Sequence, residues 1–512
     1  MANSKKSILE SKSLQNVDST IGVANFEELH QRPFNLWSTL GLAFSVTCTP
    51  LAIGSYLSVS VGVGGSPVFL FGYIFSALMN LCICISLAEI SAIYPHASGQ
   101  IYWTAVLSPK RFVRPMGYLS GWLTSAGWLF WGASSCLLTS QLTWALVQAC
   151  DSTFVTQLWH FYVLFIACAV VALIINIPLF RWYPHLLKTM VFYTNLGAIF
   201  IFIVLLVRAT PKQSAEAVFV DIINNTGWDS KGVVFFIGLL PGVTAVNAFD
   251  SAAHLAEEMP EPRKQVPKVM MISALLSFVA TIPMIFAYMF SIVNQEALYN
   301  PVGNQPIIQL FLDSMASLPL TIISSLLLIL AMIMSAVTIL TTFSRIWWSL
   351  ARDNGTPFPH LFSRIMTKDE LPVPAILFGF SASVALGAIQ LGSTTAINAI
   401  LGAGIICMML SYVVPIILFL GARNNLPDNR YFNLGRFGAI FNVIAILWTI
   451  FIIVWLFFPL YLPVTALTMN YSIAVIAGVF TVSLINWFAY SRKVFKEPTG
   501  MVLETVEPID DV

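Results

Sequence analysis

The chain has 512 residues, of which 57% are hydrophobic and only 10% are charged, and its mean hydropathy is +0.81. Soluble globular domains carry about 25% charged residues, so this composition excludes that class. The formal net charge of +1 gives no reason to expect a nucleic-acid partner. Apolar runs of roughly 20 residues, long enough to cross a bilayer as a helix, recur along the chain and predict an all-α polytopic membrane protein.

Hydropathy divides the chain into three parts. Residues 1–35 are expected to form a cytoplasmic N-terminal tail, and residues 491–512 an acidic cytoplasmic C-terminal tail. Residues 36–490 are expected to form a membrane domain of about twelve transmembrane helices. The predicted spans are 36–63, 67–93, 116–149, 159–178, 186–207, 232–256, 269–293, 318–343, 374–391, 397–420, 437–459 and 464–489.

The distribution of basic residues supports this count. If the N-terminus is cytoplasmic, only three of the 25 lysines and arginines fall in outer segments, namely Arg208, Lys212 and Lys231. Basic residues concentrate on the cytoplasmic side of membrane proteins, so the bias favours twelve spans with both termini in the cytoplasm. The sequon Asn224-Asn225-Thr226 falls in a predicted outer loop, which makes Asn224 a glycosylation candidate.

The first and sixth predicted spans both contain helix-breaking residues. The first has Pro50 and then Gly54-Ser55, and the sixth has Pro241-Gly242. Proline removes a backbone donor and glycine tolerates the dihedrals of an interrupted helix, so we expect broken helices in both spans. Because the two spans lie five apart, the pattern predicts two inverted repeats of five helices with a binding site between them. Ordinary proline kinks are the alternative, since other spans also contain proline.

Asp250 lies inside the sixth predicted span, where a carboxylate costs roughly 2.5–3.5 kcal/mol to insert. Ionisable residues in such positions usually face a polar cavity and serve a function. A proton and a cationic solute could compete for this carboxylate. His254, one helical turn later, and Glu257 are further candidates for proton coupling. The alternatives are a structural aspartate that caps a half-helix, and a histidine that pairs with a glutamate at the membrane edge.

The third predicted span carries two tryptophans three residues apart, Trp128 and Trp131. Aromatic faces attract ammonium groups, by about 2 kcal/mol when the contact is desolvated. With Phe249 and Asp250, these rings could form a box for an amine or a quaternary ammonium. Packing between helices, or a belt of aromatic residues at the membrane interface, is the alternative.

Two charged residues near the predicted inner membrane face are gating candidates. Glu89 ends the second span just before Tyr94, and Arg345 begins the inner loop RIWWSLARDNGTP. Glu89 could equally be structural, and Arg345 could pair with Asp353 or with lipid phosphate. The seven cysteines show no metal-ligand spacing, so we expect no metal and interpret them as small apolar side chains.

A family resemblance rests on four segments, which are FNLWSTLGLAFS (34–45), EISAIYPHASGQIYW (89–103), FDSAAHLAEEMPEPRKQVPK (249–268) and SRIWWSLARDNGTPFP (344–359). In this order they resemble the amino acid–polyamine–organocation permeases, and in particular the fungal branch that includes the GABA and choline permeases. The resemblance implies the inverted-repeat fold with two extra C-terminal helices, and uptake of amino acids or amines, usually coupled to protons and without a cofactor.

The resemblance also places the solute between the unwound parts of spans one and six, here Thr47–Ser55 and Leu240–Asp250. The chain departs from the family in two places. Many relatives have a Gly-x-Gly in span one that holds an α-carboxylate, where this chain has Pro50–Gly54. Some proton-coupled relatives have a lysine in span five, where this chain has Thr194 or Asn195. These departures weaken α-amino acid recognition and favour coupling through Asp250 or a carboxylate elsewhere.

We therefore expect residues 36–490 to form a twelve-helix secondary transporter of the plasma membrane, and not an enzyme. Its expected partners are protons, membrane lipid and an imported solute such as choline, GABA or an amino acid. Half-helix amides at Gly54-Ser55 and Gly242-Val243 would bind a carboxylate or hydroxyl of the solute. The expected solute-binding residues are Thr47, Pro50, Gly54, Ser55, Trp128, Trp131, Pro241, Gly242, Phe249 and Asp250.

Three alternatives stay open at this point. The first is export of an alkaloid-like metabolite, because the fold does not determine the direction of transport. The second is a receptor that binds a nutrient without transporting it. The third, an intramembrane enzyme built on Asp250 and His254, is the weakest, since Ser251 is not placed by any recognisable nucleophile motif.

Overall fold

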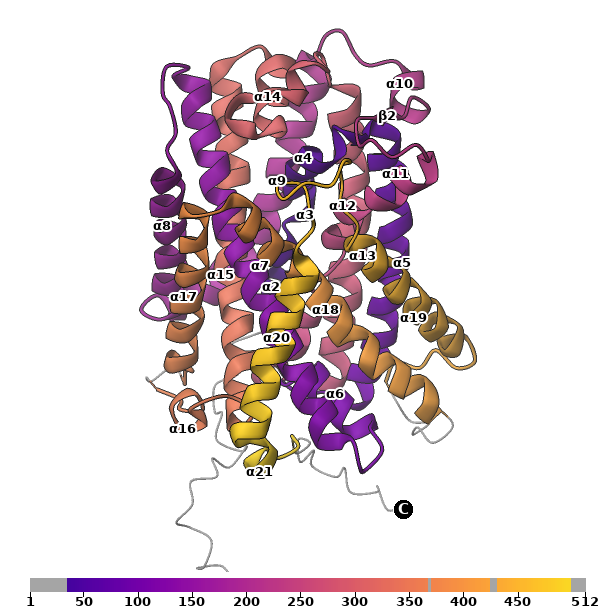
Figure 1. The fold of residues 1–512 in the computed structure, drawn as a ribbon, viewed down its shortest axis with the longest axis vertical. Coiled ribbons are helices and arrows are strands. Elements are labelled where there is room, and N and C mark those ends of the chain that lie inside the picture. Colours follow the sequence, from indigo (N-terminus) through magenta and orange to yellow (C-terminus); the bar gives the residue numbers. More distant parts are fainter. Residues whose placement is uncertain (1–34, 367–369, 424–430, 499–512) are drawn as a thin grey trace, which may run out of the picture.

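The structure is a computed structural model that describes residues 35–366, 370–423 and 431–498 (Figure 1). Within these residues the fold is a bundle of helices, which confirms the all-α polytopic class. Helices α6, α16 and α21 lie at one end of the bundle, called the α6 end below. Helices α10 and α14 lie at the opposite end, called the α14 end. Most of both predicted tails, residues 1–34 and 499–512, lies outside the described residues.

The elements follow the predicted spans closely. In the first half they are α2 Leu36–Thr47, α3 Thr49–Ala52, η2 Ile53–Tyr56, α4 Leu57–Ser60, β1 Val63–Gly64, α5 Gly65–Ile93, α6 Gln100–Leu107, α7 Val113–Cys150, α8 Leu158–Asn176, η3 Phe180–Trp182, α9 Tyr183–Arg208, α10 Ala215–Phe219, β2 Ile223–Asn224, α11 Lys231–Ile237, α12 Leu240–Ala245 and η4 Phe249–Glu258. In the second half they are α13 Pro262–Phe290, η5 Ala297–Tyr299, η6 Val302–Asn304, α14 Pro306–Met315, α15 Leu318–Arg352, α16 Pro359–Phe362, α17 Val373–Ala388, η7 Ile389–Leu391, α18 Thr394–Ala422, α19 Phe437–Leu456, α20 Ser472–Asn486, the π-helix η9 Trp487–Ser491 and α21 Arg492–Val494.

Eleven helical segments of the described chain are long and apolar enough to cross a membrane. They correspond to every predicted span except the third. That span is α7, a continuous helix of 38 residues whose many serines, threonines and glycines make it less apolar than the others. Because α7 packs against α15 and α18 inside the bundle, its polar groups are shielded from lipid. The count of twelve spans and the inverted repeat stay predictions.

A glycine contact sets the distance between α7 and α18. A Cβ at Gly127 of α7 would lie 2.5 Å from Met408 Cγ and 3.2 Å from the carbonyl oxygen of Gly404, both on α18. Small residues let helix backbones approach closely in membranes. The close approach places Trp128 of α7 and Tyr412 of α18 in the same layer of the bundle.

The first span is broken, as predicted, but at a different residue. Helix α2 ends where Cys48 adopts a left-handed conformation with φ 45°. Pro50 lies in the first turn of α3, where its missing N–H costs no helical hydrogen bond. Gly54 follows in the 3-10 turn η2. The break therefore precedes the proline, which starts the next helical segment instead of ending the previous one.

The sixth span is broken as well, and the predicted position at Pro241-Gly242 is wrong by several residues. Pro241 lies in the first turn of α12, and the main unwound stretch is Val246–Ala248, where Ala248 has φ 56°. Gly242 serves close packing, because a Cβ there would lie 2.1 Å from the Ser76 hydroxyl oxygen on α5. Beyond the break the chain continues as the ten-residue 3-10 helix η4.

Asn80 on α5 satisfies the carbonyl groups that the break in span six leaves unpaired. Its Nδ2 donates to the carbonyl oxygens of Val243 at 2.7 Å and Val246 at 2.9 Å. Its Oδ1 accepts from Trp448 Nε1 of α19 at 2.8 Å. Unsatisfied backbone groups are costly within a membrane, so irregular backbone persists there only where side chains supply partners. Asn80 therefore stabilises the unwound stretch and ties it to α19.

A short antiparallel pair of strands lies near the α14 end. Val63 of β1 pairs with Asn224 of β2, and Gly64 pairs with Ile223. Asn224, the predicted glycosylation candidate, is exposed, and its Nδ2 donates to the Trp228 carbonyl at 2.7 Å. Glycosylation at this residue stays a prediction.

Candidate functional site

A cavity of about 50 Å³ lies between the two broken spans, with walls from α2, η2, α7, α12 and α15. A single buried water needs roughly 10–15 Å³, so the cavity has room for a few waters and must widen to admit a larger solute. Its walls carry hydroxyl and aromatic groups and no charged side chain. The lining includes the predicted site residues Thr47, Ser55 and Trp131, together with Thr49, Tyr56, Ser134, Ser135, Thr244 and Ser335.

Hydroxyl groups on the cavity wall hold the helix breaks in place. Thr49 Oγ1 donates to the carbonyl of Ala245 at 2.9 Å, which joins the start of α3 directly to the end of α12. Ser335 Oγ of α15 donates to the carbonyl of Val46 at 2.5 Å. The unwound parts of spans one and six are thus side by side, as the resemblance implied.

Asp250 is fully buried and is the centre of a polar network. Gln100 Nε2 of α6 donates to its Oδ2 at 2.6 Å, and Trp128 Nε1 of α7 donates to the same oxygen at 3.3 Å. Tyr412 Oη of α18 lies 2.6 Å from Oδ1, and His254 Nε2 lies 3.3 Å from Oδ2. Three elements that are distant in sequence, α6, α7 and α18, therefore converge with His254 of η4 on one carboxylate.

The hydrogen bonds of His254 determine how protons are arranged in this network. Its Nδ1 lies 2.9 Å from the carbonyl of Ala97, which can only accept, so Nδ1 carries a proton. If Nε2 carried none, its lone pair would point at the Asp250 carboxylate, and the two would repel. The contact between His254 Nε2 and Asp250 Oδ2 is therefore favourable when a proton lies between the two atoms. Gly99 makes room for the ring, because a Cβ there would lie 2.7 Å from His254 Cε1.

The predicted aromatic box is only partly assembled. Trp128 and Trp131 stack with ring centroids 6.0 Å apart, so Trp131 lies on the cavity and Trp128 lies between it and Asp250. Phe249 stacks on Tyr412 at 5.4 Å. Asp250 is not among the residues that line the cavity. Trp128 and Trp131 therefore connect the Asp250 network to the cavity wall.

Four other predicted binding residues lie outside the cavity lining, namely Pro50, Gly54, Pro241 and Gly242. Gly54 instead permits close packing, since a Cβ there would lie 2.6 Å from Ile307 Cδ1 of α14. All four are buried. Their positions are consistent with shaping the helix breaks, and direct contact with solute stays a prediction.

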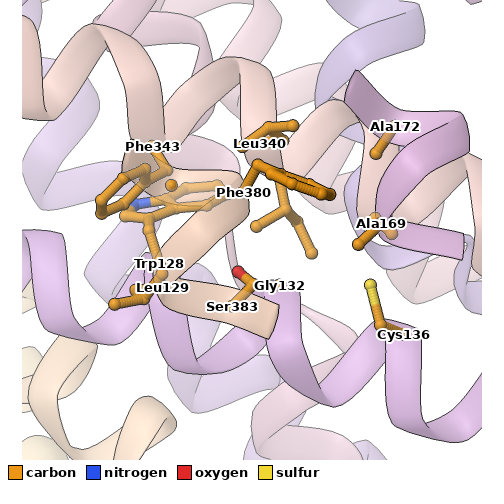
Figure 2. A pocket seen from close by; sticks show the side chains of 13 residues that line it. Trp128, Leu129, Gly132, Cys136, Ala169, Ala172, Leu340, Phe343, Phe380 and Ser383 are labelled. Atoms are coloured by element: carbon orange, nitrogen blue, oxygen red, sulfur yellow. The ribbon is translucent and has the colours of Figure 1, made fainter. Parts of the chain in front are cut away.

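A second, smaller pocket of about 20 Å³ lies on the other side of α7, against α8, α15 and α17 (Figure 2). Trp128, Leu340, Phe343 and Phe380 contribute large apolar groups to its wall, and Ser383 contributes a hydroxyl. The volume suits one water and is smaller than that of the cavity between the broken spans. The cavity between the broken spans is therefore the better candidate for a solute site.

Ion pairs connect the elements at the α6 end, below Asp250. Arg345 of α15 pairs with Glu258 of η4 at 3.1 Å, and Arg352 pairs with Glu257 at 3.3 Å. Glu89 of α5 pairs with Arg423 at 3.2 Å in the same layer. Both predicted gating residues, Glu89 and Arg345, thus belong to this ion-pair layer. Glu257 also lies 3.9 Å from His96 Nε2. The structure thus places Glu257 in the ion-pair layer, three residues beyond His254.

Charge reversal tests whether the pair of Arg345 and Glu258 acts as a gate. Arg345→Glu is expected to lower the initial rate of uptake at least about tenfold, because two carboxylates would then face each other in a nearly buried site. The double variant Arg345→Glu/Glu258→Arg restores the pair and is expected to recover most of the rate. The measurement is uptake at matched surface expression, and a double variant as slow as the single one would contradict the pairing.

Asp353, which follows α15, gives a prediction about stability and pH. Burial raises the pKa of its carboxyl from 3.8 to about 7; the nearby Arg352 opposes the shift and Glu257 adds to it. Between these two pKa values the folded state keeps a proton that the unfolded chain loses. The folded state therefore becomes less stable as pH rises from 3.8 to about 7. Above pH 7, Asp353→Asn is expected to raise the free energy of unfolding by at most roughly 4 kcal/mol, which is measured as a higher thermal midpoint in detergent. Below pH 4 the thermal midpoint is expected to change little. Asp229→Asn, at an exposed carboxylate, is the matched control, and equal stabilisation at both pH values would contradict the assignment.

Sequence reasoning missed three polar partners of the Asp250 network. Gln100 lies inside the quoted segment EISAIYPHASGQIYW, but nothing in that segment indicates that it contacts Asp250. Tyr412 is a polar residue within an apolar span, which is a usable signal. Asn247 adds an amide whose Oδ1 lies 3.0 Å from Tyr412 Oη. Partners that come from different spans are visible only once the helices are packed.

The chain is similar over almost its whole length to known transporters and permeases. It is 30% identical to the choline transporter of Saccharomyces cerevisiae, across 95% of this chain and 86% of that protein. It is 28% identical to a swainsonine transporter of Arthroderma benhamiae, across 93% of this chain and 95% of that protein. It is 26% identical to amino-acid permease 2 of Neurospora crassa, across 95% of this chain and 90% of that protein. The model of the amino acid permease family matches residues 34–480. The chain therefore belongs to the amino acid permease family, within the amino acid–polyamine–organocation superfamily, and is a multi-pass membrane transporter.

Proposed function

We propose that this transporter imports choline or a closely related quaternary ammonium across the plasma membrane, coupled to protons. The observation that carries the proposal is the pairing of two sites. The first is the uncharged cavity, which is lined by aromatic and hydroxyl groups that include Trp131. Trp131 stacks on Trp128, which donates to Asp250 of the buried pair of Asp250 and His254. The first site suits a cationic solute, and the second holds one proton.

The cavity favours a quaternary ammonium over the other candidate solutes. Such a group has no N–H to donate, so it needs ring faces and electrostatic attraction rather than hydrogen-bond acceptors. Trp131 and Tyr56 supply ring faces, while Thr47 and Ser55 can hydrogen-bond a solute hydroxyl. GABA and amino acids also carry a carboxylate, and no basic side chain lines the cavity to pair with it. The identity to the yeast choline transporter points the same way.

Coupling would act through η4 rather than by direct contact. A solute cation and an added proton repel each other, so direct contact would favour exchange of one for the other. Helix η4 carries Asp250 and His254 at its start and the ion-pair residues Glu257 and Glu258 at its end. A change in the proton shared by the first two would thus shift the segment that holds the gate closed.

Tracer uptake in yeast that lacks its own amine and amino acid permeases tests this proposal. Choline, GABA and a set of amino acids are compared at acid and neutral external pH, with surface expression measured in parallel. Saturable accumulation of choline, faster at acid pH, is the expected result. Accumulation of GABA or of an amino acid in its place would refute the assigned solute, and accumulation of choline that does not depend on pH would refute proton coupling.

Export of an alkaloid-like metabolite is a second candidate, and the identity to a swainsonine transporter makes swainsonine the solute to test. Export predicts no uptake from the panel despite normal surface expression. Everted membrane vesicles that accumulate swainsonine, and not choline, would establish it.

A further inference from the structure

Two concave surfaces lie one below the other along α7 and α20. The upper surface is a groove of about 400 Å³ between α7, α15, α17, α18 and α20, called the apolar groove below. Its wall is hydrocarbon and aromatic, with Trp122 and Leu129 from α7, Phe343 from α15, and Gly478 and Val482 from α20. Figure 1 shows α20 on the outside of the bundle, in front of α7 and α18.

The lower surface is a recess of about 500 Å³ at the α6 end, called the basic recess below. It is formed by the residues that precede and begin α7 and by residues of η9, α21 and the segment that follows them. Four cationic side chains line it, against one carboxylate: Lys110, Arg111, Arg114 and Arg492, against Glu497. The rings of Trp487 and Phe488 complete the wall, and the ring of Phe488 is strongly exposed.

Arg114 gives the recess a fixed shape. Its Nε donates to the carbonyl of Phe495 at 2.8 Å, and its Nη2 donates to the carbonyl of Arg492 at 3.0 Å. These bonds hold the segment after α20 against the start of α7. The guanidinium of Arg492 therefore lies on the same recess as Lys110 and Arg111, which are exposed and available to a ligand.

The spacing of the two surfaces matches the shape of a lipid. Arg114 and Trp122 are eight residues apart on α7, which corresponds to roughly 12 Å along a helix. A phosphate in the recess would thus lie at headgroup depth, with the apolar groove immediately deeper in the hydrocarbon layer. We propose that an anionic phospholipid binds here, with its phosphate and headgroup on Lys110, Arg111 and Arg492 and an acyl chain in the apolar groove.

A second copy of the chain is the weaker candidate for this surface. A twofold contact across α20 would bring the same patch of both copies together. Each copy's basic recess would then face the other's, and like charges would repel. A phospholipid places opposite charge in the recess and hydrocarbon in the groove at the same time.

A bound lipid would also contact helices that build the solute cavity. Trp122 and Leu129 belong to α7, which carries Trp128 and Trp131, and Phe343 belongs to α15, which carries Ser335. Occupancy of the groove is therefore expected to stabilise the packing of α7 against α15. Lipid binding at this surface does not depend on which solute is transported.

Native mass spectrometry of the purified full-length protein tests the site, with palmitoyl-oleoyl phosphatidylserine as the probe and the phosphatidylcholine of the same chains as the neutral reference. The triple variant Lys110→Gln/Arg111→Gln/Arg492→Gln is expected to bind the anionic probe roughly 100-fold more weakly, since each basic residue near the surface contributes about one tenfold step or less. Binding of the neutral lipid is expected to change little.

Two further variants separate the site from general surface charge. Arg181→Gln/Arg364→Gln/Arg436→Gln removes three exposed cations away from the recess and is expected to leave affinity for the probe unchanged. Gly478→Phe places a ring on the groove wall, where a Cβ has no other atom within 4 Å, and is expected to weaken binding of the probe with all charges intact. Equal loss in the charge control, unchanged binding in both site variants, or a dimer that Gly478→Phe disrupts would each overturn the proposal.

Discussion

Asp250→Asn is expected to lower the rate of solute accumulation roughly 100-fold, which corresponds to about 3 kcal/mol for a buried, charge-assisted network. Asparagine keeps the shape of the side chain but cannot share a proton with His254. Its amide group would also present N–H donors to Gln100 or Trp128, both of which now donate to the carboxylate. The measurement is initial uptake over a range of external pH at matched surface expression.

The residual uptake of Asp250→Asn gives the sharper result. If Asp250 carries the coupling proton, the little uptake that remains is expected to lose its dependence on external pH. Tyr412→Phe is the matched control, because it removes one hydroxyl from Oδ1 and leaves the pair of Asp250 and His254 intact. That variant should be slower but still respond to pH. An Asp250→Asn protein with unchanged rate and pH dependence would show that this carboxylate is structural.

Trp131→Ala is expected to raise the KM for choline about 30-fold, which corresponds to the roughly 2 kcal/mol of a desolvated cation–π contact. Trp131 lies on the cavity wall, so its ring is placed to meet the ammonium group. Trp131→Phe keeps a ring face and should raise KM only a few-fold. Because the ring binds the cation before and during transport, most of the loss should appear in KM and little in the maximal rate.

Trp128→Phe tests whether Trp128 affects the pH dependence of uptake while Trp131 binds the solute. It keeps a ring under Trp131 but removes the N–H that Asp250 accepts at 3.3 Å. The expected result is an altered pH profile with nearly normal KM, the reverse of Trp131→Ala. If both variants raised KM equally and left the pH profile alone, the two rings would form one binding surface and the proposed separation of solute and proton sites would be wrong.

The broken helices and the stretches that contain the breaks were predictable from the sequence, but the residues at which the helices break were not. Proline and glycine mark spans one and six, but the left-handed residues that make the breaks are Cys48 and Ala248. Neither type favours that conformation. The surrounding contacts impose it, among them the bond from Thr49 to the Ala245 carbonyl. Local sequence therefore identifies which helix is interrupted, while tertiary packing decides at which residue.

The candidate site was likewise predictable only in part from the sequence. Asp250 could be singled out because a carboxylate is expensive inside an apolar span. Its four partners come from α6, α7, α18 and η4, and no spacing in the sequence relates the first three to it. The sequence also suggested that Asp250 contacts the solute directly. In the structure Asp250 does not line the cavity and accepts from Trp128 of α7, and direct contact with a solute stays a prediction.

Asn80 has a further consequence for how the transporter can move. Its three hydrogen bonds join α5, the unwound part of span six and Trp448 of α19. A conformational change that keeps these bonds must move α5, the unwound part of span six and α19 together as one rigid body. The hinge then lies elsewhere in the bundle. Helix α19 exposes Leu447 and Ile450 on its outer face. Changes in bilayer thickness that tilt α19 would therefore reach the backbone beside the cavity, and a small molecule wedged between α19 and α5 from the lipid side could arrest transport without entering the solute pathway.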